Sequence, residues 1–160
     1  MQIRKAGIED AKRLAYIESV CFPEAEAASL ESIIKRLDVF SDCFYVMEEQ
    51  GEIIGFINGM VTNDTTISDN MFEDAALHRK DGQWQSVFGL DMLPEYRCQG
   101  RAALLMEALM AEARSKGRKG CILTCKEHLI HYYEKFGYRN QGVSKSIHGG
   151  AVWYDMILEF

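Results

Sequence analysis

One segment of the chain, from Leu90 to Ala102, has the residue types and spacing of an anion-binding loop. Its order predicts an apolar strand that stops at Pro94, then a basic loop, then the start of a long helix. The first N–H groups of a helix have no partner within it, and the helix dipole adds partial positive charge there. Gly100 lets a ligand approach the main chain closely, and Arg97 and Arg101 add full charges. The segment therefore predicts a site for a phosphate or pyrophosphate group.

The loop matches neither of the two common nucleotide-binding motifs. It lacks the G-x-G-x-x-G of dinucleotide folds and the G-x-x-x-x-G-K-[ST] of nucleotide-triphosphate loops. The pattern Arg97-x-x-Gly100-x-Ala102, after a strand that ends at Pro94, resembles the coenzyme A pyrophosphate loop of the GCN5-related N-acetyltransferases. The resemblance implies acetyl-CoA as co-substrate, held by a continuous loop of six residues: Arg97, Cys98, Gln99, Gly100, Arg101 and Ala102.

Three further segments extend the resemblance over most of the chain. Leu123-Thr124-Cys125 and the later run 131–138 are similar to the family's L-x-C…(F/Y)-Y-x-(K/R)-x-G-F. Residues 21–29 and the C-terminal pattern Ser144-x-Ser146-x-His148-Gly149-Gly150-x-x-Trp153 resemble the arylalkylamine (serotonin-type) N-acetyltransferase branch, and its microbial relatives more closely. The resemblance implies transfer of an acetyl group from acetyl-CoA to a primary amine, arylalkylamine or polyamine-like, by direct attack in a ternary complex.

The resemblance also assigns roles to single residues. Tyr133 matches the family's tyrosine, which implies a general acid, because a phenol with a pKa of about 10 suits a departing thiolate. Met92 corresponds to the position whose main-chain N–H contacts the thioester carbonyl, and Leu90 to one that lends main-chain groups to the pantetheine arm. Simple packing of a helix by Tyr132 and Tyr133 is the alternative explanation for the tyrosine.

The general base is left open. In the animal serotonin-type enzymes two histidines on the strand relay the proton, and the corresponding residues here are Ser86 and Phe88. Glu26 is the first candidate to replace them, because partial desolvation in a small-residue loop would raise its pKa toward that of a useful base. A solvated loop carboxylate is the alternative, and Glu24 is a weaker form of the same hypothesis. His148 would relay protons, touch substrate, or serve a tight turn.

Composition narrows the remaining possibilities. The 160 residues are 48% hydrophobic, which suits one acetyltransferase domain over 1–160. A net charge of -6 without a basic run argues against nucleic-acid binding. No segment reaches the roughly 18 apolar residues of a membrane span, and the N-terminus has no apolar signal core, so a cytoplasmic protein is expected. The five cysteines lack a C-x-x-C, which predicts reduced thiols and no metal site.

Hydrophobic spacing predicts the elements that position these residues. We expect an α/β fold with a mixed central β-sheet flanked by about four helices, in the order β-α-α-β-β-β-α-β-α-β-β. The strands fall near residue 3 and at 44–48, 53–61, 86–92, 121–125, 138–145 and 151–158. The helices fall at 9–20, 29–37, 100–115 and 128–136, with a polar insert at 63–84. Exposed strand edges would allow a homodimer.

The sequence is compatible with more than one function. A closed, aromatic-lined pocket would favour a small amine, and an open groove would favour a protein lysine or N-terminus. The missing histidine pair would also suit a non-catalytic acyl-CoA-binding regulatory module. Four aromatic residues could line an aryl pocket, although packing in the core is the alternative at each: Phe22, Phe72, Trp84 and Trp153.

Overall fold

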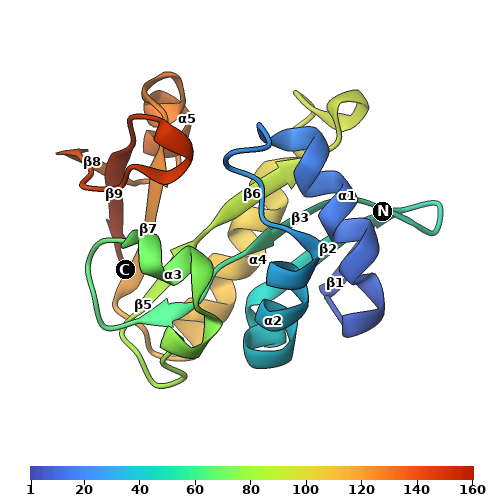
Figure 1. Ribbon diagram of the computed structural model, residues 1–160, viewed down its shortest axis with the longest axis horizontal. Coiled ribbons are helices and arrows are strands. Elements are labelled where there is room, and N and C mark those ends of the chain that lie inside the picture. Colours follow the sequence, from blue (N-terminus) through green and yellow to red (C-terminus); the bar gives the residue numbers. More distant parts are fainter.

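The computed structural model describes residues 1–160 and has the expected mixed α/β architecture (Figure 1). The five α-helices are α1 (Ala11–Cys21), α2 (Leu30–Phe40), α3 (Asp69–Glu73), α4 (Arg101–Ser115) and α5 (Ile130–Glu134). The strands are β1 (Gln2–Lys5), β2 (Phe44–Glu49), β3 (Glu52–Asn58), β4 (Val61–Thr62), β5 (Trp84–Val87), β6 (Gly89–Met92), β7 (Gly120–Cys125), β8 (Arg139–Val143) and β9 (Tyr154–Glu159).

The strands form two sheets instead of one continuous sheet. The first has the order β1-β2-β3-β6 and is antiparallel throughout. The second has the order β4-β5-β7-β9-β8, in which β5 and β7 run parallel and the other pairs are antiparallel. The parallel strands β5 and β7 are joined by a helical crossover, because α4 lies between them in the chain.

The two sheets meet at a single residue, Phe88. Val87 pairs with Leu123 of β7, whereas Gly89 pairs with Asn58 of β3. The strand predicted at 86–92 thus changes partner in its middle and is two strands, a change that periodicity cannot reveal because both halves are apolar. Beyond Phe88, β6 and β7 do not pair, and their backbones diverge like the two sides of a wedge (Figure 1).

Helices cover both faces of the sheets. In Figure 1, α1 and α2 lie in front of the first sheet and α4 lies behind it. One hydrophobic core of 20 residues includes Leu14, Ile33 and Phe56 and packs under α1 and α2. A second core of 15 residues includes Leu105 and Leu109 of α4. The amphipathic stripes predicted from sequence therefore bury against opposite faces.

Several predicted boundaries are wrong in detail. The strand expected at 53–61 stops at Asn58, and β4 starts a new pairing with β5. Gly59 lies at this break, and only glycine fits there, because a Cβ would lie 1.9 Å from the Ser86 carbonyl oxygen. The helix expected at 128–136 is only the short α5, preceded by a 3₁₀ turn at Glu127–Leu129. The polar insert contains α3.

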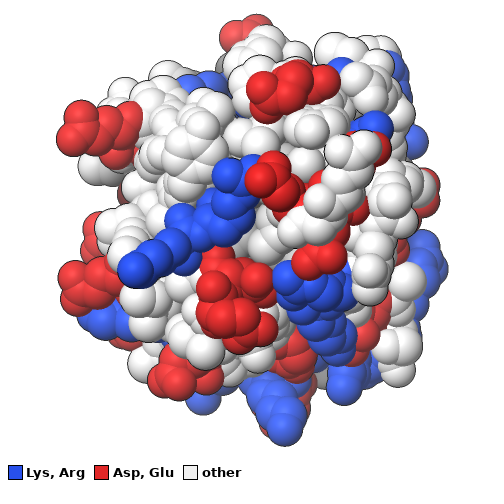
Figure 2. Space-filling model, turned by 90° about the vertical axis from the view of Figure 1, so that its right-hand side faces the viewer, with Lys and Arg blue, Asp and Glu red and all other residues white.

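Charged side chains of both signs are interspersed on the face in Figure 2, where lysines and arginines lie directly beside aspartates and glutamates. That face carries no broad basic field of the kind that nucleic-acid binding requires. None of the helices has the length and apolar character needed to cross a bilayer. The cytoplasmic location and the homodimer stay predictions.

Candidate active site

The loop before α4 presents its main chain as a set of hydrogen-bond donors. The N–H groups of residues 98–102 donate no hydrogen bond within the protein. Cys98 has φ +61° and Gly100 has φ +76°, so the main chain here adopts left-handed conformations that are costly for the cysteine. Consecutive N–H groups in such turns converge on an anion, and the helix start adds its dipole. This geometry is compatible with a pyrophosphate, and the role of the loop stays a prediction.

The two loop arginines have other partners. Arg97 donates from Nε to the Met92 carbonyl oxygen at 2.8 Å. Arg101 is ion-paired with Glu49, and its guanidinium lies 5.1 Å from the Tyr96 ring centroid. Arg97 therefore fastens the loop to the end of β6, and the Arg101 charge is largely neutralised. The main-chain donors remain as the principal anion-binding groups.

A cavity of about 400 Å³ opens where β6 and β7 diverge. Its walls include residues 87–90 on one side and 123–126 on the other. Predicted site residues from distant parts of the chain meet there: Glu26, Leu90, Tyr133 and His148. Met92 lies two residues beyond Leu90 on β6, with its side chain buried in the second core. The wedge thus links the cavity to the anion-binding loop at the end of the same strand.

Tyr133 projects from α5 onto the cavity beside Cys125. Burial raises the pKa of Tyr133 well above its usual value, and the neighbouring Cys125 and Tyr132 add to the effect. The phenol consequently keeps its proton throughout the neutral range. Burial also raises the pKa of Cys125 to about 11, so this thiol is not an activated nucleophile.

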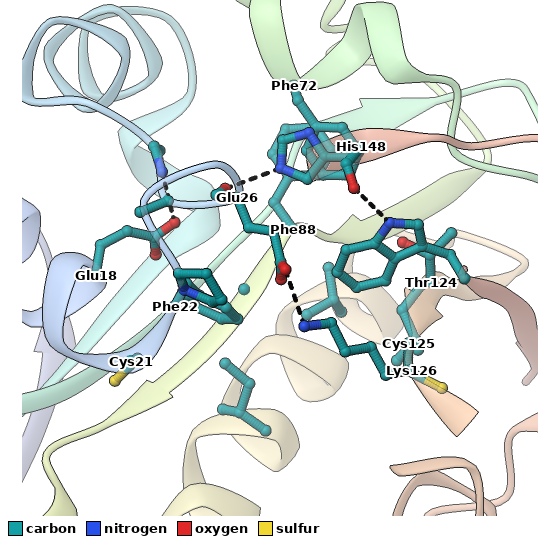
Figure 3. A pocket seen from close by; sticks show the side chains of 18 of the residues that line it. Glu18, Cys21, Phe22, Glu26, Phe72, Phe88, Thr124, Cys125, Lys126 and His148 are labelled. Carbon is teal, nitrogen blue, oxygen red and sulfur yellow. Dashed lines mark hydrogen bonds and ion pairs between the residues drawn. The ribbon is translucent and has the colours of Figure 1, made fainter. Parts of the chain in front are cut away.

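Glu26 lies in the cavity wall with its side chain only 6% exposed (Figure 3). Its Oε2 accepts a hydrogen bond from Lys126 Nζ at 2.9 Å, and its Oε1 is buried without any partner. The expectation of a desolvated loop carboxylate thus agrees with this geometry, although its role stays a prediction. Glu24 is exposed and does not line the cavity.

His148 closes the same region from the C-terminal turn (Figure 3). Its Nε2 donates to the main-chain oxygen of Glu26 at 2.8 Å, and its ring stacks on Phe72 with centroids 4.6 Å apart. Since a carbonyl oxygen only accepts, Nε2 must carry a hydrogen, and only Nδ1 is left to take a proton. Trp153 donates from Nε1 to the His148 oxygen at 2.8 Å, which fixes the turn.

Three of the four aromatic residues predicted for an aryl pocket line the cavity, and the fourth does not. Phe22, Phe72 and Trp153 line the cavity, and Trp84 is buried in the first core. Lys126 lies 5.6 Å from the Trp153 ring centroid, so its ammonium contacts both an acid and an aromatic face.

Sequence reasoning missed four charged groups of this site. Lys126 and Glu18 line the cavity with Arg36, and Asp91 lies buried next to them on β6. Lys126 directly follows the segment Leu123–Cys125, which offered one signal for it. The other three carried none, because Glu18 and Arg36 lie on amphipathic helices and Asp91 interrupts an apolar strand.

Comparison with known proteins agrees with this geometry. Residues 11–138 match the model of the "Acetyltransferase (GNAT) family". The chain belongs to this family. The GNAT fold recurs in the loading GNATL domain of CurA from Lyngbya majuscula, with a TM-score of 0.84, 16% identity, and 99% and 96% of the two chains covered. It recurs in the PaiA N-acetyltransferase from Thermoplasma acidophilum in complex with coenzyme A, with a TM-score of 0.74, 16% identity, and 99% and 98% covered.

A curated relative supports the predicted branch more weakly. Serotonin N-acetyltransferase of Mesocricetus auratus is 26% identical over 95 residues, which are 59% of this chain and 44% of that protein. The chain thus spans less than half of that relative's length. Family membership identifies a GNAT acetyltransferase domain, and the predicted recognition and fold class are confirmed. No group of three or more His, Cys, Asp or Glu side chains is arranged to hold a metal ion.

Proposed function

We propose that the protein transfers the acetyl group of acetyl-CoA to a small primary amine, arylalkylamine or polyamine-like, by direct attack in a ternary complex. One observation carries this proposal. A single cavity joins the Tyr133 helix, the Glu26 loop and the divergent strand β6 that leads to the anion-binding loop. The stacked rings of Phe72 and His148 form part of the cavity wall, which supports a small molecule as the acceptor.

The coenzyme contributes an acetyl group activated as a thioester. In this proposal the main-chain N–H groups of residues 98–102 hold its pyrophosphate, and Leu90 and Met92 hold the pantetheine and the thioester carbonyl. Residues 97–102 lie between the turn Pro94–Tyr96, which follows β6, and the first residues of α4, and this position supports the proposed role. Holding both reactants in one wedge removes much of the entropic barrier to their reaction.

Glu26 receives the amine. An ammonium group entering the cavity would satisfy the buried, unpartnered Oε1, while Lys126 holds Oε2. Phe22, Phe72 and Trp153 supply apolar contacts for the rest of the acceptor. Whether Glu26 also acts as the base, as the sequence predicts, is decided by the pH dependence of its variant.

Tyr133 provides the proton for the departing thiolate. Its raised pKa keeps the hydroxyl protonated until a basic sulfur appears beside it. The hydroxyl then recovers a proton from the newly acylated nitrogen or from solvent, so the proton count closes over one turnover.

The proposal is tested by thiol release from acetyl-CoA with a panel of arylalkylamines, polyamines and peptides. We expect turnover with at least one small amine and little with peptides. Turnover confined to peptides would favour a protein lysine or N-terminal acceptor. Tight coenzyme binding with no turnover on any acceptor would favour the regulatory module.

A further inference from the structure

Asp91 is a buried acid that the proposed reaction leaves without a role. It lies on β6 between Leu90 and Met92, and it is 0% exposed. No N–H or O–H of the protein donates to either of its carboxyl oxygens. An ionised carboxylate in such surroundings would lose several kcal/mol of hydration, so the group is stable there only when it holds a proton.

Glu18, near the end of α1, is an acid that lies close to Asp91. Its charge is near enough to raise the pKa of the Asp91 carboxyl group. Both reach the main chain at Gly89, where a Cβ would lie 2.8 Å from Asp91 Oδ1 and 3.6 Å from Glu18 Oε1. Gly89 therefore leaves the space that the two carboxyl groups share. Glu18 Oε2 accepts from the Ala28 N–H at 2.9 Å (Figure 3).

Ionisable groups from three helices lie around the pair. Burial, followed by the charge of Glu18, raises the pKa of Asp91 well above its usual value. Cys21 of α1 adds to this rise, and Arg36 of α2 opposes it. Tyr133 of α5 is near enough that a charge on Asp91 would raise the pKa of its phenol. Arg36 is committed elsewhere, since it donates to Asn58 Oδ1 at 3.2 Å and its guanidinium lies 4.8 Å from the Phe88 ring centroid.

Only Glu18 of the two acids lines the cavity. It therefore faces the acceptor space, while Asp91 lies behind it next to the thioester-binding positions of β6. We propose that Glu18 takes the proton from the acceptor's ammonium group and that protonated Asp91 is the positioning residue that holds it. This inference rests on the proposed function and supplies the base that the Ser86 and Phe88 positions lack.

The proposed step is a simple proton transfer. One N–H bond of the ammonium breaks, its electron pair stays on nitrogen as the lone pair needed for attack, and an O–H bond forms on Glu18. Glu26 and Glu18 then have different roles. Glu26 binds the ammonium cation, and Glu18 removes a proton from it. Glu18 returns the proton to solvent through the cavity that it lines.

Glu18→Gln tests this assignment with two matched acceptors. One is the best amine of the panel, and the other is its fluorinated analogue, whose ammonium pKa lies below the assay pH. With the ordinary amine, kcat/KM should fall by about 100-fold and rise with pH by about tenfold per unit, because only the free base in solution reacts. With the fluorinated amine, which arrives neutral, most of the loss should disappear. Glu31→Gln, an exposed carboxylate paired with Lys35, serves as control.

Recovery of activity with the fluorinated amine distinguishes a catalytic role of Glu18 from a structural one. A merely structural Glu18 would lose the same activity with both amines, which would overturn the assignment, as would an unchanged kcat/KM in Glu18→Gln. Coenzyme binding measured by calorimetry should be retained. If wild-type protein acetylates no amine at all, it is the proposed function that fails.

Asp91 is tested by two substitutions. Asp91→Leu removes the proposed proton donor to Glu18 and should shift the acidic limb of the pH–rate profile. Asp91→Asn resembles the protonated acid in shape and can donate to Glu18, so it should restore most of what Asp91→Leu loses. Equal losses and equal profiles in both variants would overturn the positioning role. Independently of folding in the variants, infrared spectra of wild-type protein at neutral pH should show a protonated carboxyl band, and its absence would exclude the shared proton.

Discussion

The coenzyme side and the acceptor side of this molecule are built in different ways. The first is a continuous loop, with Gly100 at the start of α4, whose main-chain N–H groups have no acceptor within the protein. The second is assembled from side chains of α1, the following loop, β7, α5 and the C-terminal turn. Main-chain donors therefore tolerate side-chain change, whereas an assembled pocket depends on each of its side chains.

The largest effect is expected at Tyr133, on the acceptor side. Tyr133→Phe should lower kcat by about 100-fold with little change in the KM for acetyl-CoA, because only protonation of the thiolate is lost. Tyr132→Phe is the matched control, since Tyr132 lies on the same helix with its ring against Tyr133 but does not line the cavity. Steady-state kinetics would measure both. Equal behaviour of the two variants would make Tyr133 a packing residue.

Removal of the Glu26 charge should weaken the acceptor side selectively. Glu26→Gln should raise the KM for the amine by about 30-fold, the value of one charge-assisted hydrogen bond, and leave the KM for acetyl-CoA unchanged. Glu24→Gln, in the same loop but exposed, should change neither by more than about twofold. A shift in the acidic limb of the pH–rate profile would instead identify Glu26 as the base.

On the coenzyme side, substitution of Gly100 should weaken coenzyme binding. Gly100→Ala adds a Cβ at φ +76°, which costs about 1 kcal/mol and crowds the anion, so the KM for acetyl-CoA should rise about tenfold. Gly117→Ala has nearly the same main-chain strain, at φ +71°, and open space around it, but lies at the other end of α4. It should lower stability equally and leave the coenzyme KM alone. Similar kinetics for both would contradict a main-chain anion site.

The smallest effect concerns stability and follows from Asp91. Its raised pKa means that the folded protein keeps a proton that the unfolded chain releases above a pH of about 4, so Asp91 makes stability fall as pH rises. The gain in unfolding free energy of Asp91→Asn over wild type should therefore grow with pH, by at most about 1.4 kcal/mol per unit. Urea denaturation at several pH values measures it. A constant difference would mean that Asp91 is ionised in the folded state.

Local sequence determined the elements and the coenzyme side of this protein. Hydrophobic spacing fixed the helices and most strands, and the loop Arg97–Ala102 could be recognised because its donors are consecutive in the chain. The predicted Tyr133 followed from a family pattern over a few residues. Such features can be recognised from the sequence because their chemistry depends on residues that are neighbours in the chain.

Only the tertiary structure decided the acceptor side. Phe88 lies in an apolar run, and no local signal shows that the strand changes partner there and opens the wedge. The contact of Glu26 with Lys126 joins residues 100 positions apart, and Asp91 meets Glu18 only because α1 packs against β6. Burial and pairing of charges depend on which surfaces meet in the fold, and these meetings set what each carboxyl group can do.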